Sequence, residues 1–294
     1  MINGILIKNA FWKSASMQEM EALLCCAANR LGITLQVRTN QDFSFSLPAL
    51  SPLTPPEEAD FILFWDKDIR LALQLETAGY RLFNTAKSIA LCDDKTLTHL
   101  ALMQAGLPMP ETILCPSTFP AAGYPDPAFL QRAAMRLSWP MIIKEGCGSF
   151  GQQVYLANDI AQAKAILAEK AGSPLLLQRF IRESAGSDIR LYMVNGKCIA
   201  AMERRNESDF RANIQIGGSA LPYTPTRDEV DLAAKACSCL GLSFAGVDLL
   251  HSKNGPLLCE VNSNAHFSAL EKLTHSDVAG AILSHIQEVI CKAG

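Results

Sequence analysis

The sequence lacks the features that mark several specialised classes of protein. None of its apolar runs is long enough to span a bilayer, and its first residues lack the basic region and apolar core of a signal peptide. The formal net charge is only −3, so no excess of basic residues favours nucleic acid or anionic lipid. These absences predict a cytoplasmic protein that binds neither nucleic acid nor membrane. A homo-oligomer is compatible with them.

Disulfide and zinc spacings are also missing. The chain has ten cysteines but no C-x-x-C pair, which favours reduced core thiols. The five histidines show no metal spacing either, and most are interpreted as surface or interface residues. The cysteines on which this interpretation rests lie in apolar segments: Cys25, Cys26, Cys198, Cys237, Cys239 and Cys259.

The 294 residues are 49% hydrophobic and 19% charged, which is typical of a globular protein of one to three domains. In the first part of the chain, strand and helix patterns alternate. This alternation predicts a small parallel-sheet α/β domain over residues 1–88, without a glycine-rich phosphate fingerprint after its first strand. Its expected elements are a strand at 4–8, a helix from a capping box at Ser16 and Glu19 to Gly32, a strand at 33–37, a Pro-rich connection through Pro56, a strand at 61–65 and a helix at 69–77.

From residue 89 the pattern changes, and a second domain is expected over 89–294. Asp93 or Asp94 caps a helix that ends before Pro108, and a loop rich in Pro and Gly follows. The later elements are expected to be a strand at 139–145, a strand, helix and strand reaching 175–181, paired strands at 188–194 and 197–205, and helices at 227–240 and 277–290.

A predicted β-hairpin over residues 245–262 carries oxygen-bearing side chains on one face. Glu260 and Asn262 are two residues apart in one strand, and a three-residue turn at 253–255 places Asp248 opposite Glu260. A two-residue turn would put Asp248 out of register. The surrounding apolar residues indicate a buried hairpin, and buried carboxylates need a cation. Mg²⁺ or Mn²⁺ is therefore favoured over a solvated surface hairpin.

A short glycine-rich turn follows the predicted strand at 139–145. Gly146, Gly148, Ser149 and Gly151 would let backbone N–H groups approach phosphate oxygens, although a plain hairpin would have a similar sequence. Lys144 precedes this turn on the strand, and a buried lysine needs an anion such as phosphate. Lys95 fits the same role, but a lone helix lysine is more often solvated.

Arginines gather in the region of the paired strands. Arg190 shares a strand face with Asp188, and Arg204, Arg211 and Asn213 follow. Guanidinium groups that face a carboxylate-held metal suit phosphoryl transfer, where they neutralise developing charge. The alternative is a surface of exposed salt bridges, which stabilises little.

Taken in order, these segments resemble the ATP-grasp ligases, and most of all the RimK-like α-L-glutamate ligases, which add glutamate to an acceptor carboxylate. The likeness covers roughly residues 85–290 and implies an α+β ATP-grasp fold, with a lid subdomain at about 110–178 and a metal-binding subdomain at about 179–294. It rests on Asp93-Asp-Lys95, Ile143-Lys-Glu-Gly146, Gln178-Arg-Phe-Ile181, Asp188-Ile-Arg190, Glu203-Arg-Arg205, Asp209-Phe-Arg-Ala-Asn213, Gly246-Val-Asp248 and Glu260-Val-Asn262.

The resemblance also implies roles for individual residues. Arg190 and Arg204 would flank the transferred phosphoryl group, and two Mg²⁺ or Mn²⁺ ions would be held by Asp248, Glu260 and Asn262. ATP would be bound by Lys95, Lys144, Gly148, Ser149, Gly151, Gln178, Arg179, Phe180, Ile181, Asp188, Arg211 and Asn213.

Two positions depart from the family pattern. Arg179 stands where relatives usually have an acidic residue, and Asn264-Ala-His-Phe267 replaces a turn that contains Pro and Gly. That turn borders the acceptor site in the family, so Asn264 and His266 are expected to line the acceptor pocket. The alternative is that His266 only braces the loop.

The implied reaction is ATP-dependent amide formation. A carboxylate of a small molecule or of a peptide or protein C-terminus is converted to an acyl phosphate, and the amine of glutamate or another amino acid then displaces phosphate. Two alternatives stay open at this stage. One is an ATP-grasp ligase of another small-molecule or cofactor pathway, and the other is a nucleotide-binding protein without ligase activity.

Overall fold

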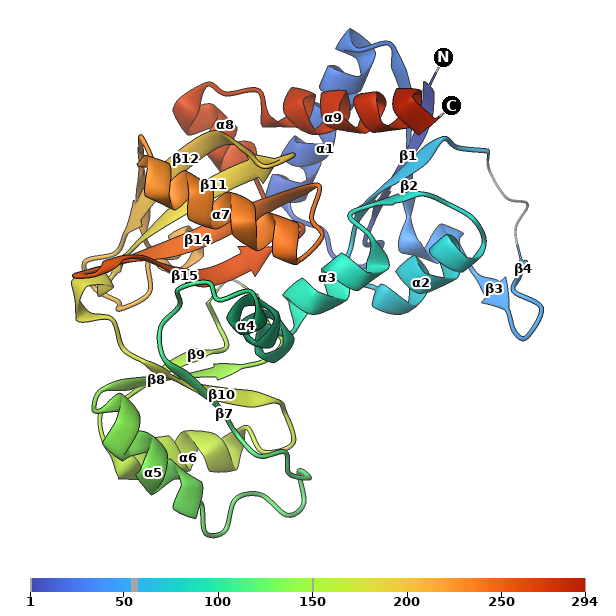
Figure 1. Ribbon diagram of the computed structural model, residues 1–294. Helices are drawn as coiled ribbons and strands as arrows, with labels where there is room; N and C mark the ends of the chain where they lie inside the picture. Colours follow the sequence, from blue (N-terminus) through green and yellow to red (C-terminus); the bar gives the residue numbers. More distant parts are fainter. Residues whose placement is uncertain (1, 54–57, 150, 294) are drawn as a thin grey trace.

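The computed structural model describes residues 2–53, 58–149 and 151–293, arranged around three main β-sheets (Figure 1). One sheet is parallel and the other two are antiparallel, which confirms the predicted mixture of α/β and α+β architecture. Part of the predicted Pro-rich connection (54–57) and Phe150 of the glycine-rich turn lie outside the described residues.

The N-terminal sheet has the strand order β2-β1-β5-β6, with every pair parallel. Alternate residues of β5 enter two different cores: Phe61, Leu63 and Trp65 face helix α1, and Ile62 and Phe64 face α2 and α3. The elements of this part are β1 (Ile2–Lys8), α1 (Ala15–Arg30), β2 (Ile33–Thr39), η1 (Asn40–Asp42), β3 (Phe45–Ser46), β4 (Ser51–Pro52), β5 (Phe61–Trp65), α2 (Ile69–Thr77), β6 (Leu82–Phe83) and α3 (Ala86–Asp93).

One helix in this part begins elsewhere than predicted, and another was not predicted at all. Helix α1 is capped by Ser14, whose hydroxyl accepts from the Met17 amide, so the predicted capping box at Ser16 is wrong. The helix expected from Asp93 or Asp94 is α4 (Lys95–Gln104), and the Asp94 side chain caps it, which confirms that prediction; α3, which ends at Asp93, was not predicted. The chain turns between the two helices, which places Asp93 and Lys95 beside the later glycine-rich turn.

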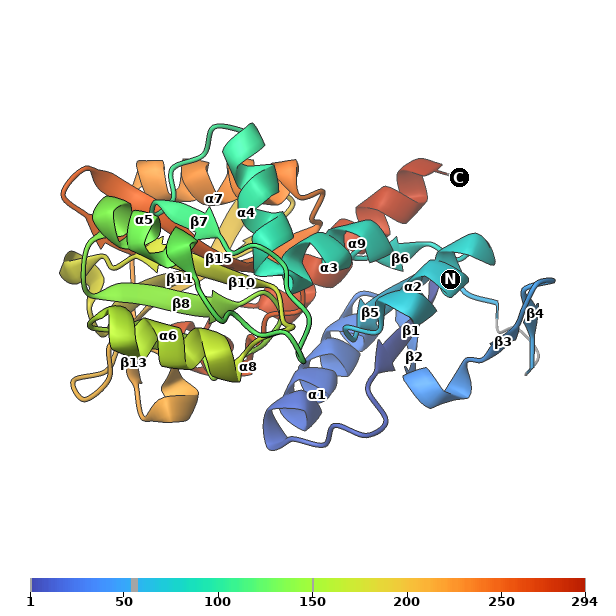
Figure 2. The ribbon, with the colours of Figure 1, turned by 90° about the horizontal axis from the view of Figure 1, so that it is seen from below.

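The second sheet forms a lid-like layer with the strand order β7-β10-β8-β9, and helices α5 and α6 cover one face of it (Figures 1 and 2). Its other face is directed towards the third sheet. Helix α5 was not predicted from the sequence, because no side chain caps it and it lies in a stretch rich in Pro. The elements are β7 (Thr112–Leu114), α5 (Ala128–Leu137), β8 (Met141–Glu145), β9 (Val154–Ala157), α6 (Ile160–Glu169) and β10 (Leu175–Arg179).

The third sheet has the order β13-β12-β11-β14-β15 and is antiparallel. Helix α7 packs on one face against residues such as Leu191 and Val247, and the opposite face carries Asp188, Arg190 and Asp248 at its polar end. The elements are η2 (Arg182–Ser184), β11 (Ser187–Val194), β12 (Lys197–Arg205), η3 (Ile214–Ile216), β13 (Ser219–Pro222), α7 (Arg227–Cys239), β14 (Phe244–Ser252), β15 (Gly255–Asn262), α8 (Ser268–Thr274) and α9 (Val278–Ala293).

A single hydrophobic core joins the N-terminal sheet to the third sheet. Trp65 of β5 stacks on Phe244 of β14 with ring centroids 5.4 Å apart, and Tyr192 of β11 meets Phe267 edge to face. The C-terminal helix α9 closes this core against α1 (Figure 1). The loops at the carboxyl ends of β1 and β5 are therefore held in place beside the polar end of the third sheet.

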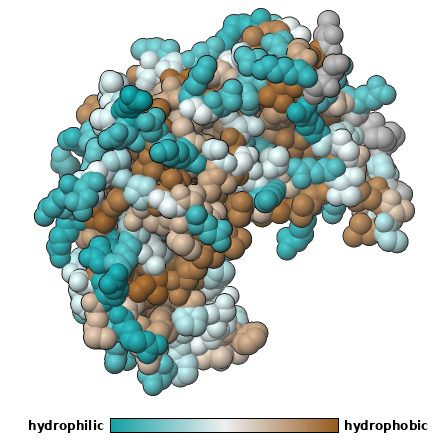
Figure 3. All heavy atoms as spheres, in the orientation of Figure 1, coloured by the Kyte–Doolittle hydropathy of each residue, from teal (hydrophilic) through white to brown (hydrophobic). Residues whose placement is uncertain are grey.

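The concave side of the molecule is hollowed between the lid-like layer and the N-terminal part, and apolar side chains surround this notch (Figure 3). Helix α4 lies at the same notch, and its spacing exposes Leu97, Leu100 and Met103 along one face. Over residues 2–53, 58–149 and 151–293, no helix is both long and apolar enough to cross a membrane.

Candidate active site

The hairpin β14–β15 places the three predicted metal ligands together, but its loop length and strand pairing differ from the prediction. Asp248 pairs with Glu260 and Gly246 pairs with Asn262, but Ser252 pairs with Gly255, so the loop has two residues instead of three. The register shifts between Asp248 and Leu249, where Cys259 is the extra residue of a β-bulge. The bulge restores the register that a two-residue loop would otherwise have broken.

Two arginines contact the carboxylate of Asp248. Arg190 donates from Nε and Nη2 to the two carboxylate oxygens at 2.7 Å each, and Arg204 Nη2 lies 2.9 Å from Asp248 Oδ2. Arg204 also donates to both oxygens of Asp188, at 2.6 and 2.7 Å. Burial alone would raise the pKa of Asp248, but the charges of Arg190 and Arg204 hold it below its ordinary value. The four groups form one buried ionic network.

The glycine-rich turn is held by cations that come from three different segments. Lys95 Nζ donates to the Gly148 carbonyl at 3.2 Å, Arg211 Nη1 donates to the Gly151 carbonyl at 2.7 Å, and Lys67 Nζ donates to Ser149 Oγ at 3.1 Å. Gly151 has a φ of +72°, and a Cβ there would lie 2.6 Å from Asn213 Oδ1. Only glycine fits this conformation and this close approach.

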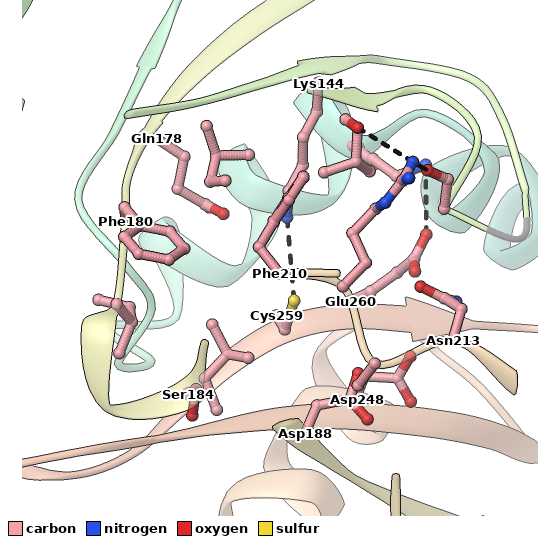
Figure 4. Close-up of a pocket in the computed structure, with 18 of the residues that line it drawn as sticks. Lys144, Gln178, Phe180, Ser184, Asp188, Phe210, Asn213, Asp248, Cys259 and Glu260 are labelled. Atoms are coloured by element: carbon pink, nitrogen blue, oxygen red, sulfur yellow. Dashed lines mark hydrogen bonds and ion pairs between the residues drawn. The ribbon is translucent and has the colours of Figure 1, made fainter. Parts of the chain in front are cut away.

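A first cavity lies between the lid-like sheet and the third sheet, with about 830 Å³ of empty space that includes its opening to solvent. Lys144 points into it from β8, and its Nζ lies 3.8 Å from Cys259 Sγ on β15 (Figure 4). Lys144 is only 5% exposed, so its charge is largely removed from water. Burial raises the pKa of the Cys259 thiol to about 11, so this neighbour is not an anion. An anionic ligand would complete the environment of Lys144.

Residues 178–181, which the family resemblance implies receive the adenine and which are called the adenine segment, form one end of this cavity. Phe180 and Ile181 line it, whereas the Arg179 side chain turns outward to pair with Glu111. The buried Gln178 amide donates to His99 Nε2 at 3.0 Å and to Thr112 Oγ1 at 2.9 Å. The departure from the family pattern at Arg179 therefore concerns a surface ion pair, which lies outside the cavity.

His99 was assigned with the surface histidines, and that assignment is wrong. It is only 6% exposed, its Nδ1 lies 2.7 Å from the Lys95 carbonyl, and its Nε2 faces the Gln178 amide. Burial lowers its pKa to about 4, so the ring is neutral, with Nδ1–H donating and Nε2 accepting. His99 thus braces the adenine segment from behind, and no local sequence signal marked it.

A second cavity adjoins the first on the side of the N-terminal sheet. His266 lines it, with its Nδ1 2.7 Å from Ser16 Oγ in the first turn of α1. Asn264 also lines it and donates from Nδ2 to the Asp66 carbonyl at 2.7 Å. The turn after β15 therefore braces the N-terminal part and also forms a wall of this cavity.

All of the predicted site residues line one of the two adjoining cavities, and several line both. The first cavity contains the twelve residues predicted to bind ATP, and the second contains Arg190, Asn262, Asn264 and His266. Four residues belong to both walls and are called the shared rim: Ser149, Arg204, Asn213 and Glu260. The sequence missed Lys67, Asp93 and Cys259, which also line these cavities.

Three oxygen donors of the hairpin, of which Glu260 belongs to the shared rim, suit a hard divalent cation. Asp248 and Glu260 supply carboxylates, and Asn262 supplies an amide whose buried Nδ2 has no hydrogen-bond partner among the described residues. Burial pushes the pKa of Glu260 up, but Lys95, 3.2 Å away, outweighs it and keeps the carboxylate ionised. Within the described ranges, no group of three or more His, Cys, Asp or Glu side chains could hold a metal. An ion here would therefore need further ligands, such as phosphate oxygens.

The ten cysteines, all of which are described, are unpaired thiols. Cys92 and Cys237 are buried in the core, but Cys26, Cys147 and Cys291 are exposed, so the prediction of core thiols is wrong for these three residues.

Comparison with known proteins identifies relatives for nearly the whole chain. The family model of the RimK-like ATP-grasp domain matches residues 92–286. A probable alpha-L-glutamate ligase of Mannheimia succiniciproducens is 31% identical over 290 residues, which cover 96% of this chain and 92% of that protein.

Two solved structures share the fold. A RimK domain ATP-grasp protein of Sphaerobacter thermophilus superposes with a TM-score of 0.72 at 21% identity, covering 97% of this chain and 99% of that one. The ATP-grasp ligase PsnB, complexed with a phosphomimetic variant of a minimal precursor, Mg and ADP, has a TM-score of 0.68 at 16% identity, with coverage of 96% and 98%.

Proposed function

This chain belongs to the RimK-like ATP-grasp family, and on that premise we propose that it is an ADP-forming ligase that joins an acceptor carboxylate to the amine of an amino acid, glutamate foremost. The observation that carries the proposal is the shared rim. Ser149, Arg204, Asn213 and Glu260 line both cavities, so a phosphoryl group at the end of the first would meet a carboxylate in the second. The name of the Mannheimia relative, a probable alpha-L-glutamate ligase, supports glutamate as the amine.

The first cavity is proposed as the ATP site. Phe180 and Ile181 would enclose the adenine end, and Lys144 and Lys95 would meet the phosphates beneath the glycine-rich turn. Arg211 and Asn213 border the same turn and would complete the phosphate contacts. Closure of this turn over the nucleotide would exclude water from the reactive intermediate.

Two Mg²⁺ or Mn²⁺ ions are proposed at Asp248, Glu260 and Asn262, whose donor set suits them. When bound, such ions would neutralise the charge of the phosphate oxygens. The proposal draws support from the Mg and ADP held by the structural neighbour PsnB.

The proposed reaction has two displacements. An acceptor carboxylate oxygen attacks the γ-phosphorus, the bond to the ADP oxygen breaks, and an acyl phosphate forms. The amine nitrogen then attacks the acyl carbon, the bond to the phosphate oxygen breaks, phosphate leaves and the nitrogen loses a proton. Arg190 and Arg204 flank this point and would stabilise the negative charge that develops, since their positions are fixed by Asp248 and Asp188.

The second cavity is proposed as the acceptor site, because it lies on the far side of the shared rim from the nucleotide. Asn264 and His266 form part of its wall, and Ser16 in the first turn of α1 lies beside His266. A small carboxylate and the C-terminus of a peptide are both compatible with this placement.

The test is ADP release when the protein is offered ATP, Mg²⁺, glutamate and a panel of carboxylates that includes amino acids, dicarboxylates and short peptides. We expect ADP and phosphate in equal amounts, with release that depends on both the carboxylate and the amine. Binding of ATP without turnover across the panel would favour a nucleotide-binding protein. Release of AMP would exclude the acyl-phosphate route.

A further inference from the structure

We propose that Lys67 is a positioning residue for the nucleotide. Lys67 belongs to the N-terminal part of the chain, and it holds the glycine-rich turn closed through Ser149. Lys67 lies in the loop between β5 and α2, outside the residues 92–286 that the family model matches. The inference rests on the proposed function, in which the turn covers ATP. It adds a residue from a different part of the chain to that closure.

The position of the Lys67 ammonium is defined by two contacts. Its Nζ lies 2.6 Å from Asp93 Oδ1 and 3.1 Å from Ser149 Oγ. Asp93 ends α3, the helix that leads from the N-terminal sheet to α4, and Ser149 lies 82 residues away from Lys67 in the glycine-rich turn. Lys67 therefore joins three segments at one point, and that point is at the shared rim.

The backbone beside Lys67 is fixed as well. Asp66 accepts the Lys67 amide at 2.6 Å and the Asn9 side chain at 3.0 Å, and the Asp66 carbonyl accepts from Asn264 at 2.7 Å. The loop therefore starts from a rigid base that also touches the wall of the second cavity. The backbone at Lys67 is therefore already ordered when its ammonium engages Ser149.

The remaining contacts of the glycine-rich turn explain why this one matters. Lys95 and Arg211 donate to the Gly148 and Gly151 carbonyls, and both are also proposed to bind phosphates, so a nucleotide would compete for them. Lys67 lines only the second cavity and is not among the residues proposed to bind ATP, so a nucleotide in the first cavity would not compete directly for its ammonium. Lys67 is thus the cation that can keep the turn closed while ATP is bound.

A simpler interpretation is that Lys67 only pairs with Asp93. The side chain of Lys67 is 43% exposed and that of Asp93 is 20% exposed, so such a pair by itself would stabilise little. The two interpretations differ in whether the effect of removing Lys67 depends on Ser149.

The experiment is a double-mutant cycle read by calorimetry with AMPPNP and Mg²⁺, using K67A, S149A and K67A/S149A. We expect K67A to weaken AMPPNP binding about three- to tenfold, the usual value of one hydrogen bond. In the S149A background the same change should have almost no effect. K67R should retain most of the affinity, and R70A, an exposed arginine in the next helix, should match the wild type.

A second readout needs no ligand. Hydrogen exchange of the Ser149 and Gln152 amides in the nucleotide-free protein should be several-fold faster in K67A than in the wild type, with thermal stability unchanged. Equal AMPPNP affinity and equal exchange in K67A would overturn the inference, as would additive effects of K67A and S149A. If the wild type fails to bind AMPPNP, the proposed function fails, and the exchange measurement still decides the contact between Lys67 and Ser149.

Discussion

The guanidinium of Arg190 donates two hydrogen bonds of 2.7 Å to the carboxylate of Asp248. Asp248 is also 2.9 Å from Arg204, so this proposed metal ligand is already paired with two arginines. Glu260, its partner across the hairpin, has a different environment, with a single lysine and 27% of its side chain exposed. The two carboxylates should therefore respond differently to removal of their charge.

For Asp248, the substitution D248N should mainly affect folding. It leaves two buried guanidinium groups with one fewer counter-charge, and breaking a buried ion pair costs about 3–5 kcal/mol. Urea unfolding should show a fall of this order in the free energy of unfolding. A loss below about 1 kcal/mol would mean that the buried network adds little to the stability of the third sheet.

For Glu260, the substitution E260Q should mainly affect catalysis. The isosteric amide keeps the shape but removes charge from the proposed metal site, so the folded protein should lose Mg²⁺-dependent ADP formation and bind Mn²⁺ at least tenfold more weakly. Glu203 is the matched control, since its side chain is 17% exposed, pairs with Arg205 and lines neither cavity. Normal turnover in E260Q at ordinary Mg²⁺ would remove Glu260 from the site.

Lys144 offers a test of the nucleotide site. K144M keeps the aliphatic stem and removes a buried charge, so AMPPNP affinity should fall about 10- to 100-fold while thermal stability holds or rises. Calorimetry and thermal unfolding measure the two quantities. K197M, on the exposed end of β12, controls for the loss of one positive charge. Unchanged nucleotide affinity in K144M would give this lysine a purely structural role.

The sequence predicted the chemistry of the site better than the geometry that produces it. The oxygen donors of the hairpin and the glycine-rich turn are local, so residue type and spacing were enough to find them. The bulge at Cys259 could not be predicted from the sequence, because one extra residue in this strand leaves no mark in its apolar pattern. The predicted turn was therefore one residue too long. His99 and Gln178 meet across 79 residues, a contact that no periodicity indicates.

The burial of His99 has a consequence for stability at low pH. Burial lowers the pKa of His99 from 6.5 to about 4, so between these values the unfolded chain binds a proton that the folded protein does not. Stability attributable to His99 is therefore full above about pH 6.5 and is lost as the pH falls towards 4, by about 3 kcal/mol in total. Urea unfolding between pH 4 and 7 should show a steeper loss in the wild type than in H99Q. Parallel profiles would mean that folding leaves the pKa of His99 unchanged.

His266 tests the assignment of the second cavity. H266A should raise the acceptor's KM or lower kcat/KM for the acceptor, and leave ATP affinity unchanged, because His266 lines only the second cavity. S16A, which removes the partner 2.7 Å from Nδ1, should shift the same constants less. If H266A instead loses stability and its folded fraction is fully active, His266 braces the loop.

The central claim is that a carboxylate in the second cavity attacks the γ-phosphoryl group of ATP in the first. The most direct measurement uses the carboxylate identified by ADP release, labelled with ¹⁸O in both oxygens, and follows the label into the products by mass spectrometry. The account predicts one ¹⁸O in each phosphate released, unlabelled ADP and an amide that retains the other ¹⁸O. Phosphate free of label, or label in AMP, would contradict it.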